Sequence, residues 1–486
     1  MEYQSTRGFP EKVTSTRAVL NGLAPDGGLY MPADLPAIKL DWRSLLDKTT
    51  MQTAEAVFAA FLPDFDDLGG IVRRAYTGKF ETDDLTPLVP VGDRFILELF
   101  RGPTSAFKDV ALSALPQFIS QARRQEQVQE KIVILTATSG DTGKAALAGF
   151  AGVEGTQIIV FYPDGGVSAV QRAQMVTQEG GNVRVCAVRG NFDDAQTGVK
   201  TIFATADAAA LKKRDVALSS ANSINIGRLV PQLVYYFKAY ADLVKAGRIA
   251  AGDKVDFTVP TGNFGDILAG YLAKRLGLPV GKLICASNAN DVLTEFLQTG
   301  RYDRKRPFRK TISPSMDILV SSNLERLLYL LSGCDAQFVA EKMAALAQSG
   351  EYTVPETMLD RLHEEFFAAK ADDAQTTETI GRVRREHGYL CDTHTAVAWN
   401  AAEQYHGENP NVVLATASPY KFPAAVCRAL GAEPSADEFA VMEQLHRMTN
   451  VPIPKNLAGL GSRKTLHTDV VDKGGMMDYV LAAMEG

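Results

Sequence analysis

From residue 87 onward the sequence repeats one pattern: a short apolar segment, a loop of small polar residues, and then a helical segment. Helices are predicted at residues 144–150, 167–179 and 267–276. The apolar segments that the pattern predicts as strands are Phe95–Leu99, Lys131–Ala137, Gln157–Tyr162, Val183–Val188, Val255–Pro260 and Val412–Ala415. Apolar strands that alternate with helices form parallel sheets covered on both faces. The chain is therefore predicted to be an α/β protein that binds ligands at the carboxyl ends of its strands.

The repeated units predict two α/β domains, at about residues 87–230 and 231–486. Residues 1–86 are expected to form a small N-terminal cap domain, with helices between residues 41 and 76 that break at Pro63 and at Gly69-Gly70. Residues 294–385 carry many charges at helical spacing and no clear sheet strand. They predict a helical insertion in the second α/β domain.

Composition limits the class of protein. The 486 residues are 46% hydrophobic and 22% charged, which is typical of a soluble globular chain. A formal net charge of −6 argues against nucleic acid or an acidic membrane as the main partner. The five cysteines are far apart and form no CxxC pair, and we find no signal-peptide pattern and no apolar run of membrane-spanning length. These features predict a cytoplasmic location.

Lys108 is the candidate nucleophile. It follows the turn-forming segment Gly102–Phe107 and precedes an apolar helical run, and it is the only basic residue between Arg101 and Arg123. Burial and a helix N-terminus both disfavour the ammonium form and leave a nucleophilic amine. Such an amine can form a Schiff base with a carbonyl compound or with pyridoxal phosphate. The alternative is a surface lysine whose stem covers apolar neighbours.

Two loops between a strand and a helix are candidate anion sites. Thr261–Asp266 contains two glycines and no cation, so its backbone N–H groups would bind the anion; a plain tight turn is the alternative. Thr138–Gly143 offers three hydroxyls beside two glycines, which suits a carboxylate or a phosphate. With Lys144 it superficially resembles a nucleotide-binding P-loop, but Thr138 and Ala145 break that pattern, and no GxGxxG follows a strand.

Asn222–Arg228 is a third polar segment. Arg228 could make a bidentate contact with phosphate or carboxylate, or the segment could simply cap a helix. His387, Cys391 and His394, with Asp392 nearby, have metal-ligand chemistry, but no fourth ligand stands at usual zinc spacing. Residues 392–396 are more typical of a turn and helix cap, so no metal is expected. No GxSxG hydrolase motif is present.

Taken together, these motifs resemble the threonine synthase family, in its long form. The resemblance covers almost the whole chain and begins with YQSTRG (residues 3–8) and GLAPDGGLY (22–30). It continues in the family's order through GPTSAFKD (102–109), TATSGDTG (136–143), GNFDDA (190–195), SANSINIGR (220–228), PTGNFGD (260–266), DTHTA (392–396) and TASPYKFP (416–423). It implies two parallel-sheet domains of the pyridoxal-phosphate fold type II, like tryptophan synthase β.

The resemblance also implies a cofactor and site residues. Lys108 would hold pyridoxal phosphate and then move protons, and Thr416 would hydrogen-bond the pyridine nitrogen. The cofactor phosphate would lie in the loop of Gly262, Asn263, Phe264, Gly265 and Asp266. The substrate carboxylate would bind Thr138, Ser139 and Thr142, and the phosphate of O-phospho-L-homoserine would bind Asn222, Ser223 and Arg228.

The implied reaction converts O-phospho-L-homoserine and water into L-threonine and phosphate, in a monomer or homodimer. Asp141 stands where the fold usually has an asparagine that contacts the cofactor's phenolic oxygen, and an ionised aspartate cannot donate that hydrogen bond. Lys421 is expected to be structural. A phospholyase or a hydroxy-amino-acid dehydratase is the alternative activity, and a cofactor-binding protein without turnover is the alternative class.

Overall fold

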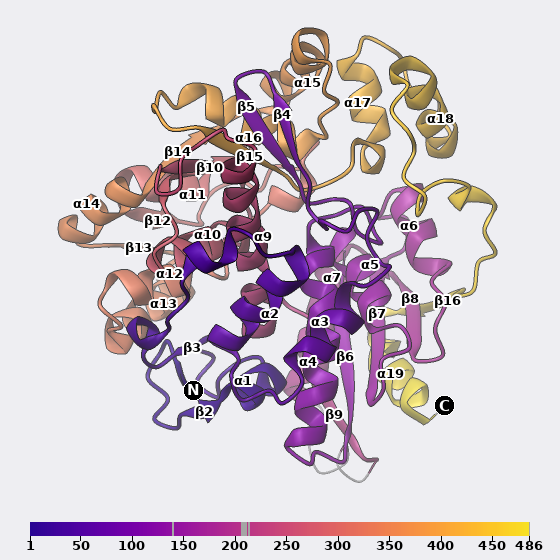
Figure 1. The fold of residues 1–486 in the computed structure, drawn as a ribbon. Coiled ribbons are helices and arrows are strands. Elements are labelled where there is room, and N and C mark those ends of the chain that lie inside the picture. Colours follow the sequence, from indigo (N-terminus) through magenta and orange to yellow (C-terminus); the bar gives the residue numbers. More distant parts are fainter. Residues whose placement is uncertain (139, 206–210, 212–213, 486) are drawn as a thin grey trace.

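The structure is a computed structural model that describes residues 1–138, 140–205, 211 and 214–485. Two parallel sheets, each flanked by helices, form the body of the molecule, and the N-terminal segment packs beside them (Figure 1). The predicted α/β architecture with two parallel sheets is confirmed.

The larger sheet has six strands. Neighbouring strands run parallel except for the β4–β5 pair, which is antiparallel. Its spatial order is β14 (Phe366–Lys370), β11 (Val280–Ser287), β10 (Val255–Pro260), β15 (Asn411–Ala415), β5 (Arg94–Glu98) and β4 (Leu88–Val91). In the middle of the sheet Thr258 pairs with Ile284 on one side and Val413 on the other. The carboxyl ends of β10 and β15, and the loops that follow them, therefore lie next to each other.

The smaller sheet has five strands, and all of its neighbours are parallel. Its spatial order is β16 (Asp469–Asp472), β8 (Val183–Arg189), β7 (Thr156–Pro163), β6 (Lys131–Ala137) and β9 (Val216–Ser219). All eight residues of β7 are buried, as expected for a central parallel strand covered on both faces.

Strand pairing crosses the predicted domain boundaries. β4 and β5 lie within the predicted first α/β domain but pair into the larger sheet, whereas β16 returns to the smaller sheet from the predicted second domain. The expectation of a helical insertion without sheet strands is also wrong in one respect. β14 forms an edge of the larger sheet, and β12 (Arg301–Asp303) pairs with β13 (Glu351–Thr353). These strands are three to five residues long, too short to produce a clear periodic pattern.

The N-terminal segment forms a small antiparallel sheet and three helices. The sheet contains β1 (Glu2–Ser5), β2 (Val13–Thr14) and β3 (Tyr30–Pro32), and the helices are α1 (Ser15–Asn21), α2 (Thr50–Phe61) and α3 (Leu68–Tyr76). The predicted break near Pro63 is confirmed. The break at Gly69-Gly70 is wrong, because Asp67 caps α3 by accepting the Gly70 N–H and the helix runs through both glycines.

Two long helices connect the parts of the molecule. α4 (Lys108–Gln125) and α9 (Ile226–Lys245) pack against each other, and α9 also packs against α2 and α10. Most of α9 is buried, as its nearly continuous apolar sequence requires. The helices around the smaller sheet are α5 (Asp141–Phe150), α6 (Ala169–Val176), α7 (Phe192–Thr205) and α19 (Met476–Glu485). The remaining helices are α10 (Gly265–Arg275), α11 (Val292–Thr299), α12 (Leu324–Leu331), α13 (Ala336–Ser349), α14 (Glu356–Glu365), α15 (Asp373–His387), α16 (Thr393–Gln404), α17 (Pro423–Ala429) and α18 (Glu438–Thr449).

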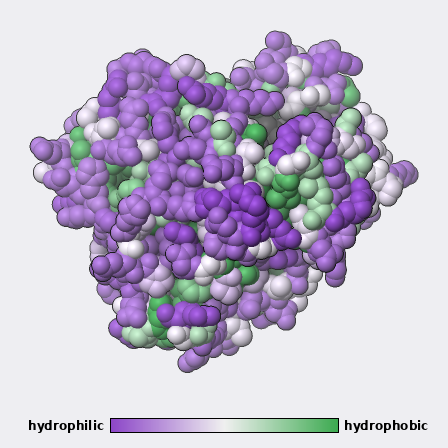
Figure 2. All heavy atoms as spheres, turned by 90° about the horizontal axis from the view of Figure 1, so that it is seen from above, coloured by the Kyte–Doolittle hydropathy of each residue, from purple (hydrophilic) through white to green (hydrophobic). Residues whose placement is uncertain are grey.

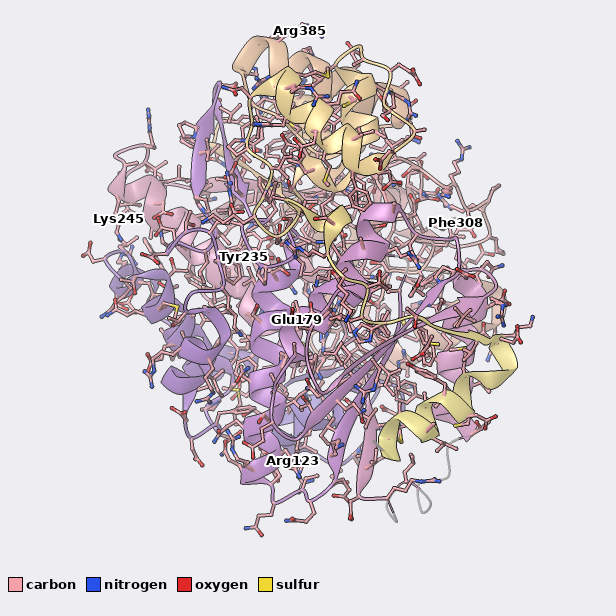
Figure 3. The ribbon with its side chains drawn as sticks, turned by 90° about the vertical axis from the view of Figure 1, so that its right-hand side faces the viewer. Arg123, Glu179, Tyr235, Lys245, Phe308 and Arg385 are labelled. Atoms are coloured by element: carbon pink, nitrogen blue, oxygen red, sulfur yellow. The ribbon has the colours of Figure 1, made fainter. Side chains whose placement is uncertain are left out.

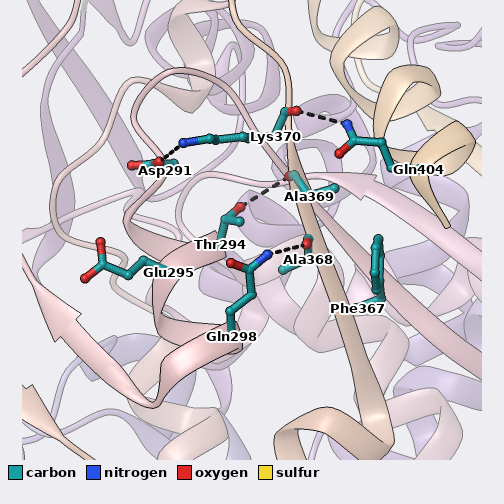
Figure 4. A pocket seen from close by; sticks show the side chains of 9 residues that line it. All are labelled: Asp291, Thr294, Glu295, Gln298, Phe367, Ala368, Ala369, Lys370 and Gln404. Carbon is teal, nitrogen blue, oxygen red and sulfur yellow. Dashed lines mark hydrogen bonds and ion pairs between the residues drawn. The ribbon is translucent and has the colours of Figure 1, made fainter.

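Side chains protect the exposed edge of the larger sheet. Along β14, the carbonyls of Ala368, Ala369 and Lys370 accept hydrogen bonds from Gln298 Nε2, Thr294 Oγ1 and Gln404 Nε2 (Figure 4). Because the Ala371 N–H donates to the Ser287 carbonyl of β11, the Ala369 carbonyl also faces β11. The bonds to Ala368 and Lys370 occupy carbonyls on the other side, which would otherwise be free to pair with another strand. We therefore assign the pocket in Figure 4 a structural role.

The surface is largely polar. The face in Figure 2 is mostly hydrophilic, and its hydrophobic side chains gather in small areas. Among the described helices, none has both the length and the apolar character needed to cross a bilayer.

Candidate active site

Lys108 is the first residue of α4, as the sequence predicted. Part of its side chain remains accessible, but its burial in the protein lowers its pKa to about 8. Asp141 nearby opposes the effect, whereas Arg228 and Lys421 add to it. Within the described residues its amine makes no hydrogen bond or ion pair; its nitrogen lies 4.5 Å from the ring centre of Phe107. The amine is therefore available to a ligand.

The loop before Lys108 is fixed by hydrogen bonds to Asp109 in α4 and to Asn456 near the C-terminus. Asp109 accepts hydrogen bonds from the backbone N–H and the hydroxyl of Thr104, and burial raises the pKa of Asp109 to about 6. Ser105 has a left-handed backbone conformation with φ 61°, and its hydroxyl donates to Asn456 Oδ1 at 2.9 Å. These contacts fix the start of α4, and with it the stem of Lys108.

The carboxyl end of β15 is joined directly to this loop. The Phe107 N–H donates to the Thr416 carbonyl at 2.8 Å, and the Ser418 N–H donates to the Ser105 carbonyl at 3.1 Å. Thr416 is 5% exposed, and its hydroxyl has no hydrogen bond to a described residue. The structure thus brings Thr416 into the neighbourhood of Lys108, as predicted.

The Gly262–Asp266 loop leads from β10 into α10 and presents unpaired backbone donors. The N–H groups of residues 262–266 donate no hydrogen bond to a described residue. Phe264, the N-cap of α10, has a left-handed conformation with φ 62°, which sharply turns the chain into the helix. A Cβ atom on Gly262 would lie 2.7 Å from the Ser315 carbonyl oxygen, so only glycine fits there. Free N–H groups at a helix N-terminus match the needs of a phosphate.

Two side chains of this loop point away from such a ligand. Asp266 Oδ1 accepts hydrogen bonds from Tyr235 at 2.6 Å and Tyr236 at 3.1 Å, and burial raises its pKa to about 6. Tyr235 lies inside the molecule, whereas Lys245, the last residue of the same helix α9, lies near its margin (Figure 3). The Asp266 side chain is thus directed toward the interior. Phe264 is buried against Phe366. These two residues can offer only their backbone N–H groups to a ligand.

The Thr138–Gly143 loop lies at the end of β6 and the start of α5. The Thr138 hydroxyl accepts from the N–H groups of Gly140 and Gly143, both at 3.0 Å, and donates to the Gly140 carbonyl. All of its hydrogen-bonding capacity is used inside the loop, which differs from the predicted contact with a substrate carboxylate. The Thr142 hydroxyl has no partner among the described residues, and Ser139 lies outside them.

Asp141 forms a buried ion pair that the sequence analysis did not foresee. Lys421 Nζ lies 2.9 Å from Asp141 Oδ1 and also donates to Gln174 Oε1 at 2.6 Å. Burial raises the pKa of Asp141, but the charges of Lys421 and Lys108 outweigh it and lower the pKa to about 2. Asp141 is thus an ionised acceptor beside Lys108. The aspartate that stands here in place of the asparagine usual in this fold is thus accompanied by a buried cation, Lys421.

The predicted phosphate clamp lies at the start of α9. Arg228 is 4% exposed and donates from one terminal nitrogen to the Ala221 carbonyl at 2.9 Å, while its Nε has no partner. Burial lowers its pKa to about 10, so it remains a cation at neutral pH. The Ser223 hydroxyl donates to Asn222 Oδ1 at 3.3 Å. Asn222 is exposed, so both side chains are accessible to a ligand.

The candidate metal ligands have other partners. Asp392 accepts the N–H groups of His394 and Thr395 and caps α16, which confirms the predicted helix cap. His394 lies 2.7 Å from Asp392 and accepts the Ser315 N–H at 3.1 Å, and His387 packs against Trp399. Across the described residues, no group of three or more metal-ligating side chains is found.

Neither the pairing of Lys421 with Asp141 nor the contacts of the Ser321–Asn323 turn with two candidate loops was predicted from the sequence. A lone lysine in an apolar segment was the signal that singled out Lys108, and Lys421 in TASPYKFP carries the same signal. Asn323 lies about 60 and 100 positions from the loops that it contacts, a separation with no local sequence pattern.

The described residues fit pyridoxal phosphate. An unpaired amine, five unpaired backbone donors at a helix start and a free hydroxyl at the β15 end correspond to the cofactor's aldehyde, phosphate and ring nitrogen. Lys108, residues 262–266 and Thr416 are the groups that could hold it.

Comparison with family models agrees with this fit. Residues 86–417 match a model described as a pyridoxal-phosphate dependent enzyme. Residues 2–76 match the threonine synthase N terminus and residues 395–474 match the threonine synthase C-terminal region.

Individual relatives cover most of the chain. Threonine synthase of Pseudomonas aeruginosa is 41% identical over 93% of this chain and 96% of its own length. Human threonine synthase-like 1 is 38% identical over 85% of this chain, and the match spans 58% of that protein's length. The crystal structure of pyridoxal-phosphate-bound threonine synthase from Brucella melitensis superposes with a TM-score of 0.90 at 40% identity, and covers 100% of both chains. The yeast enzyme gives a TM-score of 0.87 at 33% identity, over 100% of this chain and 98% of its own.

Proposed function

Because the chain belongs to the threonine synthase family of pyridoxal-phosphate-dependent enzymes, we propose that it converts O-phospho-L-homoserine and water into L-threonine and inorganic phosphate. The family and the two parallel sheets agree with the predicted fold type II and with pyridoxal phosphate as the cofactor. One observation favours a phosphorylated substrate. A second set of polar groups, Asn222, Ser223 and the unpaired Nε of Arg228, is supplied by a different segment from the loop assigned to the cofactor phosphate.

When bound, pyridoxal phosphate withdraws electrons from the substrate's α-carbon and thereby makes the neighbouring protons acidic. Lys108 would bind the cofactor and then remove and return protons, and its lowered pKa suits an amine that exchanges protons near neutral pH. Thr416 would donate its hydroxyl proton to the cofactor's ring nitrogen, and the Gly262–Asp266 backbone would hold its phosphate.

The substrate would be oriented at both of its ends. Thr142, with Ser139, would bind the carboxylate, while Thr138 shapes that loop from within. Asn222, Ser223 and Arg228 would hold the phosphate as it leaves Cγ and keep it close while water adds at Cβ. Asp141 would stay ionised beside Lys421 and accept a hydrogen bond from a donor group of the substrate or cofactor.

The decisive experiment incubates the cofactor-loaded protein with O-phospho-L-homoserine and measures both phosphate and amino-acid products. We expect equal amounts of phosphate and L-threonine, and no turnover by Lys108→Ala. Phosphate accompanied by 2-oxobutyrate would instead identify a phospholyase. A protein that binds pyridoxal phosphate but releases no phosphate would be a binding protein.

Two further properties belong to this proposal. The five cysteines form no disulfide, and four of them are buried, which suits the reducing cytoplasm. A monomer or a homodimer is expected, and sedimentation of the loaded protein distinguishes them.

A further inference from the structure

A short turn before α12, Ser321–Asn323, lies between the two candidate phosphate loops. Asn323 Nδ2 donates to the Ser223 carbonyl and to the Asn263 carbonyl, both at 3.2 Å. The Asn323 N–H also donates to the Asn263 carbonyl, and the Ser321 hydroxyl donates to the Gly262 carbonyl at 2.8 Å. The turn thus ties the loop from β10 to the loop that precedes α9.

The turn is itself fixed from behind. Arg326 is fully buried and donates to the Ile224 carbonyl at 2.6 Å and to the Tyr30 carbonyl at 3.1 Å. It also donates to Asn323 Oδ1 at 2.5 Å. Because these bonds hold Asn323, the residue before it has a defined position.

Ser322, like Asn323, faces both loops with its side chain. Its hydroxyl lies 3.4 Å from Asn263 Oδ1 and 3.4 Å from Ser223 Oγ, and it is less buried than Ser321 and Asn323 on either side. Both distances are long for hydrogen bonds between oxygen atoms, whose usual separation is about 2.7–2.8 Å. The Ser322 hydroxyl is therefore only weakly bonded to Asn263 and Ser223.

We propose that Ser322 is a further binding residue for the substrate's phosphate group, which it contacts together with Asn222, Ser223 and Arg228. The proposal rests on the proposed function for the identity of the substrate. A phosphate oxygen would accept the Ser322 proton, replacing the long contacts by a charge-assisted hydrogen bond. The ligand chemistry is a phosphate dianion, and the cofactor phosphate at residues 262–266 is the other possible source of it.

The test compares wild type with Ser322→Ala, Ser322→Thr and a control. Ser332→Ala makes the same substitution at the other end of α12, where the hydroxyl donates to the Tyr329 carbonyl and accepts the Asp335 N–H. For Ser322→Ala we expect inorganic phosphate to bind the cofactor-loaded protein about tenfold more weakly, and the KM for O-phospho-L-homoserine to rise about tenfold. Affinity for pyridoxal phosphate and for L-homoserine, which lacks the phosphate, should not change. Ser322→Thr should restore phosphate binding, and Ser332→Ala should behave as wild type.

Two results would overturn the proposal. If Ser322→Ala weakens pyridoxal phosphate binding while inorganic phosphate binding stays constant, Ser322 serves the cofactor's phosphate instead. If neither affinity changes, the residue binds no phosphate. Failure of the proposed function looks different, because wild type would then form no threonine while the phosphate-binding comparison could still support Ser322.

Discussion

Two lysines lie within the electrostatic influence of Asp141 in the candidate site, and their chemical roles differ. Lys421 forms an ion pair with Asp141 at 2.9 Å, whereas Lys108 feels that charge without contacting it. The positive charge of Lys421 stabilises the ionised form of the Asp141 carboxylate in this ion pair. Lys108 has no ion-pair partner among the described residues, and its lowered pKa increases the fraction of neutral amine, which is the form that reacts with a carbonyl.

Lys421→Met should destabilise the folded protein by about 3 kcal/mol. The methionine fills the space but leaves the Asp141 carboxylate buried without its cation. The free energy of unfolding, from urea titration at pH 7, measures the loss. Lys464→Met, at an exposed position, is the control and should change little. The Lys421→Met/Asp141→Asn double variant should recover part of the stability; no recovery would mean that the ion pair is not the cause.

The cofactor-free protein should take up pyridoxal phosphate faster as pH rises, with a midpoint near pH 8. With its pKa lowered to about 8, Lys108 is about one-tenth neutral at pH 7 and half neutral at pH 8. The rate of uptake, followed by the cofactor's absorbance between pH 6 and 10, tests this. Lys108→Ala corrects for non-covalent binding. A midpoint above pH 10, as for an exposed lysine, would show that Lys108 is not desolvated.

Local sequence therefore located the candidate nucleophile and the candidate binding loops but not their partners. Lys108, Thr416 and the Gly262–Asp266 loop each stand at a strand end or helix start, positions that local patterns reveal. The partner of Asp141 is 280 positions away, and only the fold brings Lys421 to it. Thr138 also differs from expectation, since a hydroxyl in a tight loop bonds first to the nearest N–H groups.

At the scale of elements, the position of Lys108 depends on how closely α4 packs against α5. A Cβ atom at Gly149 would lie 1.9 Å from the Leu112 carbonyl oxygen, so the two helices touch backbone to backbone there. α4 begins with Lys108 and α5 begins with Asp141. This one contact therefore sets the spacing of two residues of the site.

Gly149→Ala should destabilise the protein by about 1–3 kcal/mol, although alanine normally favours a helix. The added methyl group forces α4 and α5 apart, and we expect a higher KM as well because the residues at their N-termini shift. Urea unfolding and steady-state kinetics measure the two effects. Gly69→Ala, in α3, is the matched control, since the nearest atom is the end of the flexible Glu55 side chain at 3.1 Å. Equal stability of the two variants would refute the close-packing argument.

Strand prediction succeeded where apolar runs were long. β6 and β10 have the predicted bounds, because KIVILTA and VDFTVP are buried on both faces. β16, with the sequence DVVD, is largely exposed and β14 is an edge strand, so neither carries a long apolar run. Their pairing is determined by the rest of the sheet.

At the scale of the whole molecule, the N-terminal segment is attached to α12, the helix that follows the Ser321–Asn323 turn. Glu325 is 4% exposed and accepts hydrogen bonds from Thr6 Oγ1 at 2.6 Å and from Arg7 at 2.9 and 2.7 Å. It lies in α12, two residues after Asn323. The N-terminal segment thus supports the site without supplying a residue to it.

Glu325→Gln should lower the free energy of unfolding by about 2 kcal/mol, because Arg7 loses a bidentate carboxylate partner. Partial exposure of Arg7 keeps the loss moderate. Urea titration measures it, and Glu408→Gln, at an exposed position, is the control. A loss as small as the control's would mean that other contacts hold the segment.

The pairing of β16 with β8 has a consequence for synthesis. Residues 183–189 leave the ribosome almost 300 residues before residues 469–472, so the β8 edge has no neighbour on that side while most of the chain is made. The larger sheet meets the same delay, since β5 waits for β15. Neither sheet can be completed as its first strands emerge, and the nascent protein must keep the β5 edge from pairing with other chains until β15 is made, and the β8 edge until β16 is made.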